Sequence, residues 1–132
     1  MPTPVVKPVP TPRPTPSPVA AIPFAARQIW AGRYTCAQGD TALRLRITDV
    51  HGDDVDAVFE FSHADSGAAG SFHMSGRYEP GSHRLALTPG AWIQQPYGYE
   101  SVAISGTVSA DGATYAGSIH HPACTTFSVH HR

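Results

Sequence analysis

The sequence has little positive charge and no long apolar run. Lys7 is its one lysine, 14% of its 132 residues are charged, and its net charge is −1. Since no basic stripe is present to neutralise a phosphate backbone, we expect no nucleic-acid partner. No apolar stretch approaches the roughly 18 residues of a membrane-spanning helix, so we expect no direct membrane insertion either.

The motifs of common enzymes and metal sites are also missing. The chain has no G-x-S-x-G, C-x-x-C or H-E-x-x-H pattern, which removes the usual esterase, zinc-ribbon and metalloprotease signatures. His120 and His130 fall at opposite ends of one predicted hairpin, about 20 Å apart at ~3.3 Å per residue, so they cannot share an ion. The aspartates of DVHGDDVD fit a solvated turn, with weak calcium binding as the alternative. We therefore predict a non-enzyme that holds no metal and no cofactor.

The chain opens on a proline-rich segment that lacks the features of an export signal. Nine of the thirteen prolines fall within residues 1–23, and each proline fixes its own φ and biases the preceding residue towards an extended conformation. We predict a disordered linker over 1–23 and a folded domain over 24–132. Such spacers commonly hold domains away from a membrane anchor. This favours an extracytoplasmic fragment (periplasmic, cell-surface or secreted) cut from behind its export signal, and a cytoplasmic protein is the alternative.

From residue 29 onward, apolar and polar residues alternate with a period of two, which is typical of half-buried strands. In TALRLRITD, for example, Leu43, Leu45 and Ile47 share one face. About eight such stretches are separated by turn residues, and no helical periodicity is present. A glycine stands two positions after a large apolar residue in WAGRY, MSGRY and ISGTV, which indicates a strongly coiled sheet. We predict an all-β, antiparallel up-and-down barrel of about eight strands. The bulky inward residues Phe59, Phe61, Phe72 and Leu85 favour a filled interior, and an internal cavity is the alternative.

Two cysteines, Cys36 and Cys124, lie at the start and near the end of the predicted barrel. The first and last strands are neighbours in a closed barrel, so we predict a disulfide between the two cysteines, which would stabilise the fold by about 3–5 kcal/mol. Two buried thiols are the alternative. Strict alternation puts Cys124 on the opposite face from Phe127 and Val129, so the disulfide requires a bulge, which we place near Pro122.

Residues 30–47 match the pattern W-x-G-x-Y-x-C-x-Q-G-x-T-x-L-x-L-x-I. This pattern resembles the start of an uncharacterised bacterial β-domain that follows proline-rich linkers at the ends of larger proteins. AVFEFSH, GSFHMSGRYEP and LTPGAWIQQPYGY extend the resemblance. It implies architecture and context, and no activity. The expected barrel also resembles lipocalin-like and avidin-like barrels and the small disulfide-bearing barrels of metalloprotease inhibitors, but none of their functional motifs can be transferred to this chain.

The stretch GAWIQQPYGYE, residues 90–100, is the most aromatic part of the chain and lies between two predicted strands. Eleven residues are more than the roughly two to five of a typical hairpin loop. Aromatic faces beside amide and carboxylate groups are typical of a ligand platform. We predict ligand binding by Trp92, Gln94, Gln95, Tyr97, Tyr99 and Glu100. The alternative is that Trp92 and Ile93 plug one end of the barrel.

Three functions are compatible with this architecture. We favour a non-catalytic binding or accessory domain on a proline-rich tether, with a glycan, peptidoglycan or a protein as its ligand. A second hypothesis is a protease-inhibitor-like barrel in which the segment VAAIPFAAR, just before the first strand, enters an enzyme cleft. A third is a purely structural domain that caps a stalk.

Overall fold

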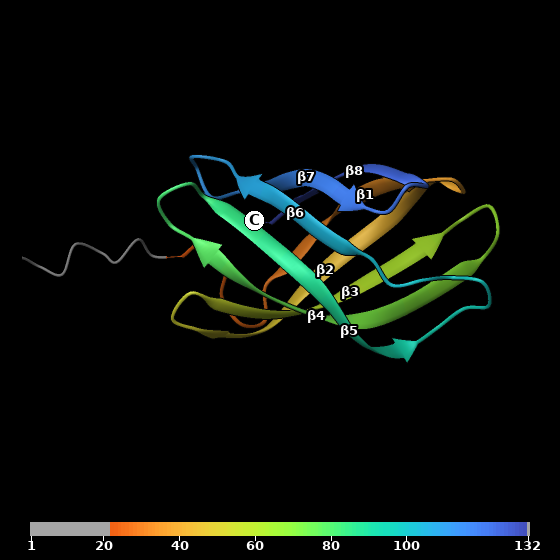
Figure 1. Ribbon diagram of the computed structural model, residues 1–132, viewed down its shortest axis with the longest axis horizontal. Helices are drawn as coiled ribbons and strands as arrows, with labels where there is room; N and C mark the ends of the chain where they lie inside the picture. Colours follow the sequence, from red (N-terminus) through yellow and green to blue (C-terminus); the bar gives the residue numbers. More distant parts are fainter. Residues whose placement is uncertain (1–21, 132) are drawn as a thin grey trace, which may run out of the picture.

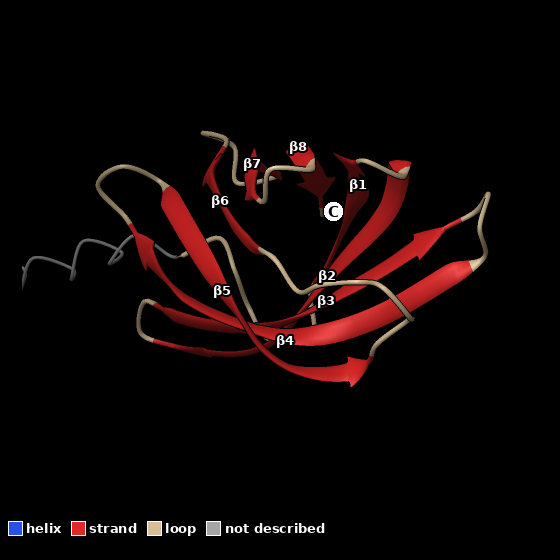
Figure 2. Ribbon diagram, turned by 45° about the vertical axis from the view of Figure 1, so that its right-hand side comes forward, coloured by secondary structure: helices blue, strands red, loops and turns tan. Residues whose placement is uncertain are grey.

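The computed structural model describes residues 22–131, and this part of the chain consists of strands and loops (Figure 2). Each strand pairs antiparallel with its neighbours in sequence, and β1 also pairs with β8, which closes a barrel (Figure 1). The strands are β1 Ile29–Cys36, β2 Gly39–His51, β3 Asp54–His63, β4 Ala68–Glu79, β5 Arg84–Gln94, β6 Ala103–Val108, β7 Thr114–His120 and β8 Cys124–His130. The predicted all-β up-and-down barrel of eight strands is confirmed.

Most of the predicted linker, residues 1–21, lies outside the described residues. Among residues 22–131, no helix is long and apolar enough to span a membrane.

The alternating side chains of the strands form a single core inside the barrel. Leu43, Leu45 and Ile47 of β2 are each no more than 1% exposed, as the period of two predicts. Tyr115 of β7 is also fully buried, and its hydroxyl donates a 2.7 Å hydrogen bond to the carbonyl of Leu85. A buried phenol needs such a partner because an unpaired polar group in the core would be costly.

One end of the barrel is closed by the segment that precedes β1. Phe24 is 2% exposed, and its ring lies 4.8 Å from that of Trp30 and 5.7 Å from that of Tyr115. The side-chain oxygen of Gln28 accepts hydrogen bonds from Ala25 N and Trp30 Nε1, which folds the segment back over the barrel. This end, at the left of Figure 1, is called the closed end.

Strand β5 is longer than the sequence predicts and corrects the expected loop at residues 90–100. It pairs with β4 as far as Gln94 but with β6 only from Arg84 to Leu87. The connection to β6 is therefore residues 95–102. Beyond Leu87, the edge of β5 that faces away from β4 has no partner in β6. Pro89 and two register shifts interrupt this stretch, and such irregularities discourage edge-to-edge association.

The predicted disulfide between Cys36 and Cys124 is present and ties β1 to β8. Tyr34 pairs with Phe127, and two residues later Cys36 pairs with Cys124, so β8 contains one extra residue between these pairs. The bulge that brings the two cysteines together therefore lies between Cys124 and Phe127. Our placement of it near Pro122 was wrong.

Glycines in the coiled part of the barrel are required by close approach between strands. A Cβ atom added at Gly76 would overlap the carbonyl oxygen of Ala86 on β5, and one at Gly106 would overlap that of Ala116 on β7. Both glycines lie within continuous strand pairing rather than at a bulge. They allow neighbouring backbones to meet more tightly than any side chain would permit.

We expect Gly76→Ala to destabilise the barrel by about 2–3 kcal/mol because the new methyl group must displace backbone of β5. Gly81, in the β4–β5 turn, is the matched control, since a Cβ there meets nothing within 4 Å. Thermal unfolding followed by circular dichroism should show a melting temperature about 10–20 °C lower for the Gly76 variant and little change for Gly81→Ala. Equal melting temperatures would contradict this account of the coiled sheet.

Candidate functional site

The end of the barrel opposite Phe24 opens into a cavity of about 480 Å³. We call this end the mouth; it consists of the connections at residues 37–38, 64–67, 95–102 and 121–123 and lies at the right of Figure 1. The predicted filled interior is therefore correct for the closed half of the barrel, where Leu85 is fully buried, and wrong for the mouth half. The cavity volume falls in the range of small-molecule sites, about 300–1,000 Å³.

The cavity wall is aromatic. Phe59 of β3 and Phe72 of β4 stack with their ring centroids 4.8 Å apart, and the ring of Tyr34 meets Phe59 edge-on at 5.4 Å. Phe61 stacks on Tyr99, which comes from the β5–β6 connection, at 5.2 Å. All five rings line the cavity. The rings pack against one another and form a continuous wall.

Polar groups reach the cavity from one corner. The Tyr34 hydroxyl, Gln38 and Thr41 lie together there, and Gln38 Nε2 donates a 3.1 Å hydrogen bond to Thr41 Oγ1. Burial raises the pKa of Tyr34 far above its usual value, and hydrogen bonds with Thr41 and Gln38 only partly oppose this. Tyr34 therefore stays uncharged at neutral pH and can exchange hydrogen bonds with a bound molecule.

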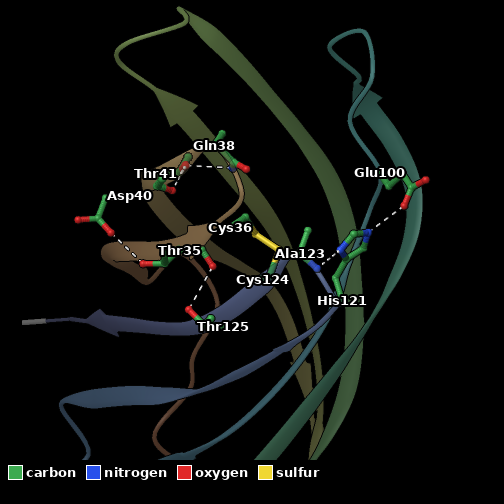
Figure 3. The surroundings of a disulfide bond; sticks show 11 residues. Thr35, Cys36, Gln38, Asp40, Thr41, Glu100, His121, Ala123, Cys124 and Thr125 are labelled. Carbon is green, nitrogen blue, oxygen red and sulfur yellow. Dashed lines mark hydrogen bonds and ion pairs between the residues drawn. A yellow bond between two sulfur atoms is a disulfide. The ribbon is translucent and has the colours of Figure 1, made fainter.

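An acid–histidine pair spans the rim beside the disulfide (Figure 3). Glu100 Oε2, from the β5–β6 connection, lies 3.0 Å from Nε2 of His121 in the β7–β8 connection. The other ring nitrogen of His121, Nδ1, accepts a hydrogen bond from Ala123 N at 3.0 Å. An accepting Nδ1 carries no proton, so Nε2 of the neutral ring donates to the carboxylate. The pair joins two mouth connections that are far apart in sequence.

The structure divides the six residues that the sequence predicted as a binding surface. Tyr99 and Glu100 line the cavity. Trp92 is half-buried and packs against the core, with its ring edge-on to Phe72 at 4.9 Å, and it does not line the cavity. Gln95 supports Tyr99 by donating to its carbonyl at 2.9 Å.

Two of the predicted residues lie outside the cavity. Tyr97, at the tip of the β5–β6 connection, is fully exposed to solvent. Gln94 donates to the carbonyl of Ala69 on the neighbouring strand at 3.3 Å. Ile93, which the alternative prediction placed in a plug, is 53% exposed. These residues do not line the cavity.

Several cavity residues were not predicted from the sequence. The aromatic positions Tyr34, Phe59, Phe61 and Phe72 have the inward alternation that is typical of core residues, and His121 stands beside a proline in a turn sequence. Their signal was the position of Cys36, which marks the mouth end of β1. Large inward residues that lie level with Cys36 on neighbouring strands surround the opening. Those nearer Phe24 pack against the segment that covers the closed end.

The chain matches no protein-family model, and no curated protein matches its sequence. The resemblance of residues 30–47 to a bacterial β-domain therefore stays a prediction. Within residues 22–131, no group of three or more His, Cys, Asp or Glu side chains is arranged to hold a metal ion. The disulfide indicates folding in an oxidising compartment, because cytosolic reductants keep most thiols reduced.

Proposed function

We propose that this protein is a non-catalytic binding domain that holds a small ligand in the mouth of its barrel. The observation that carries the proposal is the asymmetry of the two ends. The plug residue Phe24 is 2% exposed, whereas the opposite end retains a cavity of about 480 Å³. A barrel built for stability alone gains by filling such a space, because each unfilled methyl-sized void costs about 1 kcal/mol.

The composition of the cavity supports binding rather than catalysis. Its wall is formed by hydrophobic rings, and its few polar groups, such as Gln38 and the Tyr34 hydroxyl, suit the orientation of a ligand. Mostly apolar pockets with a small number of placed polar groups are typical of ligand sites. The acid–histidine pair of the mouth, Glu100 with His121, is at the rim.

The proposed setting is extracytoplasmic. The disulfide fits an oxidising compartment such as the periplasm, the cell surface or the medium. The proline-rich sequence of residues 1–23 would act as a tether that holds the domain at a distance from its anchor or from a partner domain. Ile22 and Phe24 pack at the closed end, so a tether attached there would leave the mouth free.

We expect the neutral fluorescent probe N-phenylnaphthylamine to bind the protein at micromolar concentration with an increase in emission. Tyr99→Ala removes a ring from the cavity wall and should weaken binding about tenfold. Val102→Phe places extra volume in the cavity and should weaken it similarly. Tyr97→Ala is the matched control, because Tyr97 is fully exposed and should leave the affinity unchanged.

Circular dichroism of each variant would establish that it is folded before titration. If the folded wild type does not enhance the probe, or if Val102→Phe and Tyr99→Ala bind as the wild type does, the cavity is not a binding site.

A second candidate is a glycan, peptidoglycan or protein contact on the outer surface near the mouth. The observation that favours it is the exposed pair Tyr97 and Ile93, since exposed aromatic side chains often mark interaction surfaces. The Tyr97 and Tyr99 variants separate the two candidates. Pull-down on purified peptidoglycan and polysaccharides that is lost with Tyr97→Ala and kept with Tyr99→Ala would favour the outer surface.

The inhibitor hypothesis stays a prediction. Phe24 belongs to the segment that it requires, and in this structure its ring packs against Trp30 and Tyr115. Any segment that enters a protease cleft would therefore have to exclude Phe24 or remove it from the core.

A further inference from the structure

We infer that the mouth cavity selects organic cations with a ring-containing body, such as aryl quaternary ammonium compounds, over neutral and anionic molecules of the same shape. The inference rests on the proposed binding function and adds the charge class of the ligand. Glu100 is the specificity-determining residue. Three features of the mouth support this assignment, namely the distribution of charged side chains, the position of Glu100 and the aromatic wall.

The mouth connections carry negatively charged side chains and no positively charged ones. The four mouth connections contain two carboxylates, Asp65 and Glu100, and no arginine or lysine. The six arginines among the described residues lie on strands or next to the closed end: Arg27, Arg33, Arg44, Arg46, Arg77 and Arg84. A ligand at the mouth therefore meets net negative charge. Such a field attracts cations and repels carboxylates, sulfonates and phosphates, most strongly at low ionic strength.

Glu100 is placed where a ligand would meet it. Its carboxylate lines the cavity rim, and the preceding residue, Tyr99, contributes a ring to the wall. The hydrogen bond from His121 restrains one carboxylate oxygen, while the side chain as a whole remains 75% exposed. Nδ1 of His121 accepts from Ala123 N, so the ring offers Glu100 a single hydrogen bond from Nε2 and leaves the other carboxylate oxygen available to a cation.

The aromatic wall supplies the second attraction. The faces of Phe and Tyr rings carry negative charge density, and a cation near such a face gains about 0.5–2 kcal/mol. A quaternary ammonium group has no N–H to leave unpaired and is attracted by the ring faces, which offset part of its desolvation cost, whereas an anion gains nothing from these rings. Tyr34, Phe61 and Tyr99 form the wall nearest the polar rim groups Gln38 and Glu100. The cavity therefore combines an apolar body site with a negative entrance.

The test uses three competitors of nearly identical shape against bound N-phenylnaphthylamine: trimethyl(naphthyl)ammonium, neutral tert-butylnaphthalene and naphthalenesulfonate. We expect the cation to displace the probe at about tenfold lower concentration than the neutral compound, and the sulfonate to be weaker than both. Glu100→Gln should remove most of the preference of the cation over the neutral compound. Glu79→Gln makes the same change at the closed end and should leave the preference intact. Raising the salt concentration should reduce the preference of the wild type.

The outcomes separate this inference from the function on which it rests. Lack of probe binding by the folded protein would reject the cavity as a site altogether. Probe binding with equal displacement by cation and sulfonate would reject the charge selectivity and leave the binding function standing. A preference for the cation that is unchanged in Glu100→Gln would show that this residue does not determine specificity.

Discussion

Removal of the Cys36–Cys124 disulfide is expected to lower the free energy of unfolding by about 4 kcal/mol. The bond closes a sequence interval of 88 residues, and in the chain-entropy model the stabilisation grows with the length of the closed loop. A small domain has a total stability of roughly 5–15 kcal/mol. The loss would therefore remove a large share of it and lower the melting temperature by about 15–30 °C.

Guanidinium denaturation of the oxidised protein and of Cys36→Ala/Cys124→Ala would measure this effect. Because the bond acts mainly on the unfolded chain, the variant should also show a steeper dependence on denaturant, since its unfolded state is more expanded. Treatment of the wild type with a reductant should reproduce the midpoint of the double variant. An unchanged midpoint after complete reduction would mean that the β1–β8 seam is held by strand pairing alone.

Phe24→Ala is expected to cost about 3–5 kcal/mol, the usual range for a buried phenylalanine. Phe24 is 2% exposed, and its ring contacts Trp30, Tyr78 and Tyr115. Replacement by alanine removes these contacts and opens the closed end to water. The large effect is notable because Phe24 lies outside every strand, where a change in a loop residue usually has little influence on stability.

Thermal unfolding of Phe24→Ala beside Ile29→Ala would test this prediction. Ile29 follows in the same region of the chain but is 42% exposed, so its truncation should cost less than about 1 kcal/mol. In the fraction that remains folded at low temperature, Phe24→Ala should bind N-phenylnaphthylamine with wild-type affinity, because the cavity lies at the other end. Similar melting temperatures for the two variants would show that the segment before β1 is not a structural part of the barrel.

The two predictions concern a barrel that is closed at one end and open at the other. The plug at Phe24 seals one end, and the disulfide holds the first and last strands together at the other, where its two cysteines line the cavity. Both devices stabilise the structure while leaving the mouth residues free to vary. Stability and binding should therefore be separable by mutation, with Gly76 and Phe24 affecting the first, and Tyr99 and Glu100 the second.

The strand content and the pairing order could be predicted from the sequence because both follow from local patterns. The alternation of Leu43, Leu45 and Ile47 with polar neighbours fixes which side of β2 is buried, and Gly and Asp residues mark where strands end. The disulfide could be predicted because a closed barrel puts the first and last strands, which carry the two cysteines, side by side. The position of the bulge could not be predicted, because no residue pattern between Cys124 and Phe127 marks a one-residue shift in the pairing of β8.

The residues that line the cavity were predicted only in part, and the residues concerned show why. Tyr99 and Glu100 were found because aromatic and acidic residues in a connection are unusual. Tyr97, two positions from Tyr99, has the same composition signal and is directed to solvent instead. Turn geometry decides between them: the Tyr99 amide donates to the Pro96 carbonyl, and the turn brings Tyr99 back over Phe61.

The sequence by itself determined which side chains point inward, because successive side chains of a strand alternate between the inside and the outside of a closed barrel. Only the tertiary structure decided whether an inward side chain is core or wall. Phe59 and Leu85 carry the same pattern, yet one borders a cavity and the other is enclosed. The difference depends on distance from the plug at Phe24 and on what the opposite strands contribute at that level. These are non-local quantities that alternation along one strand does not contain.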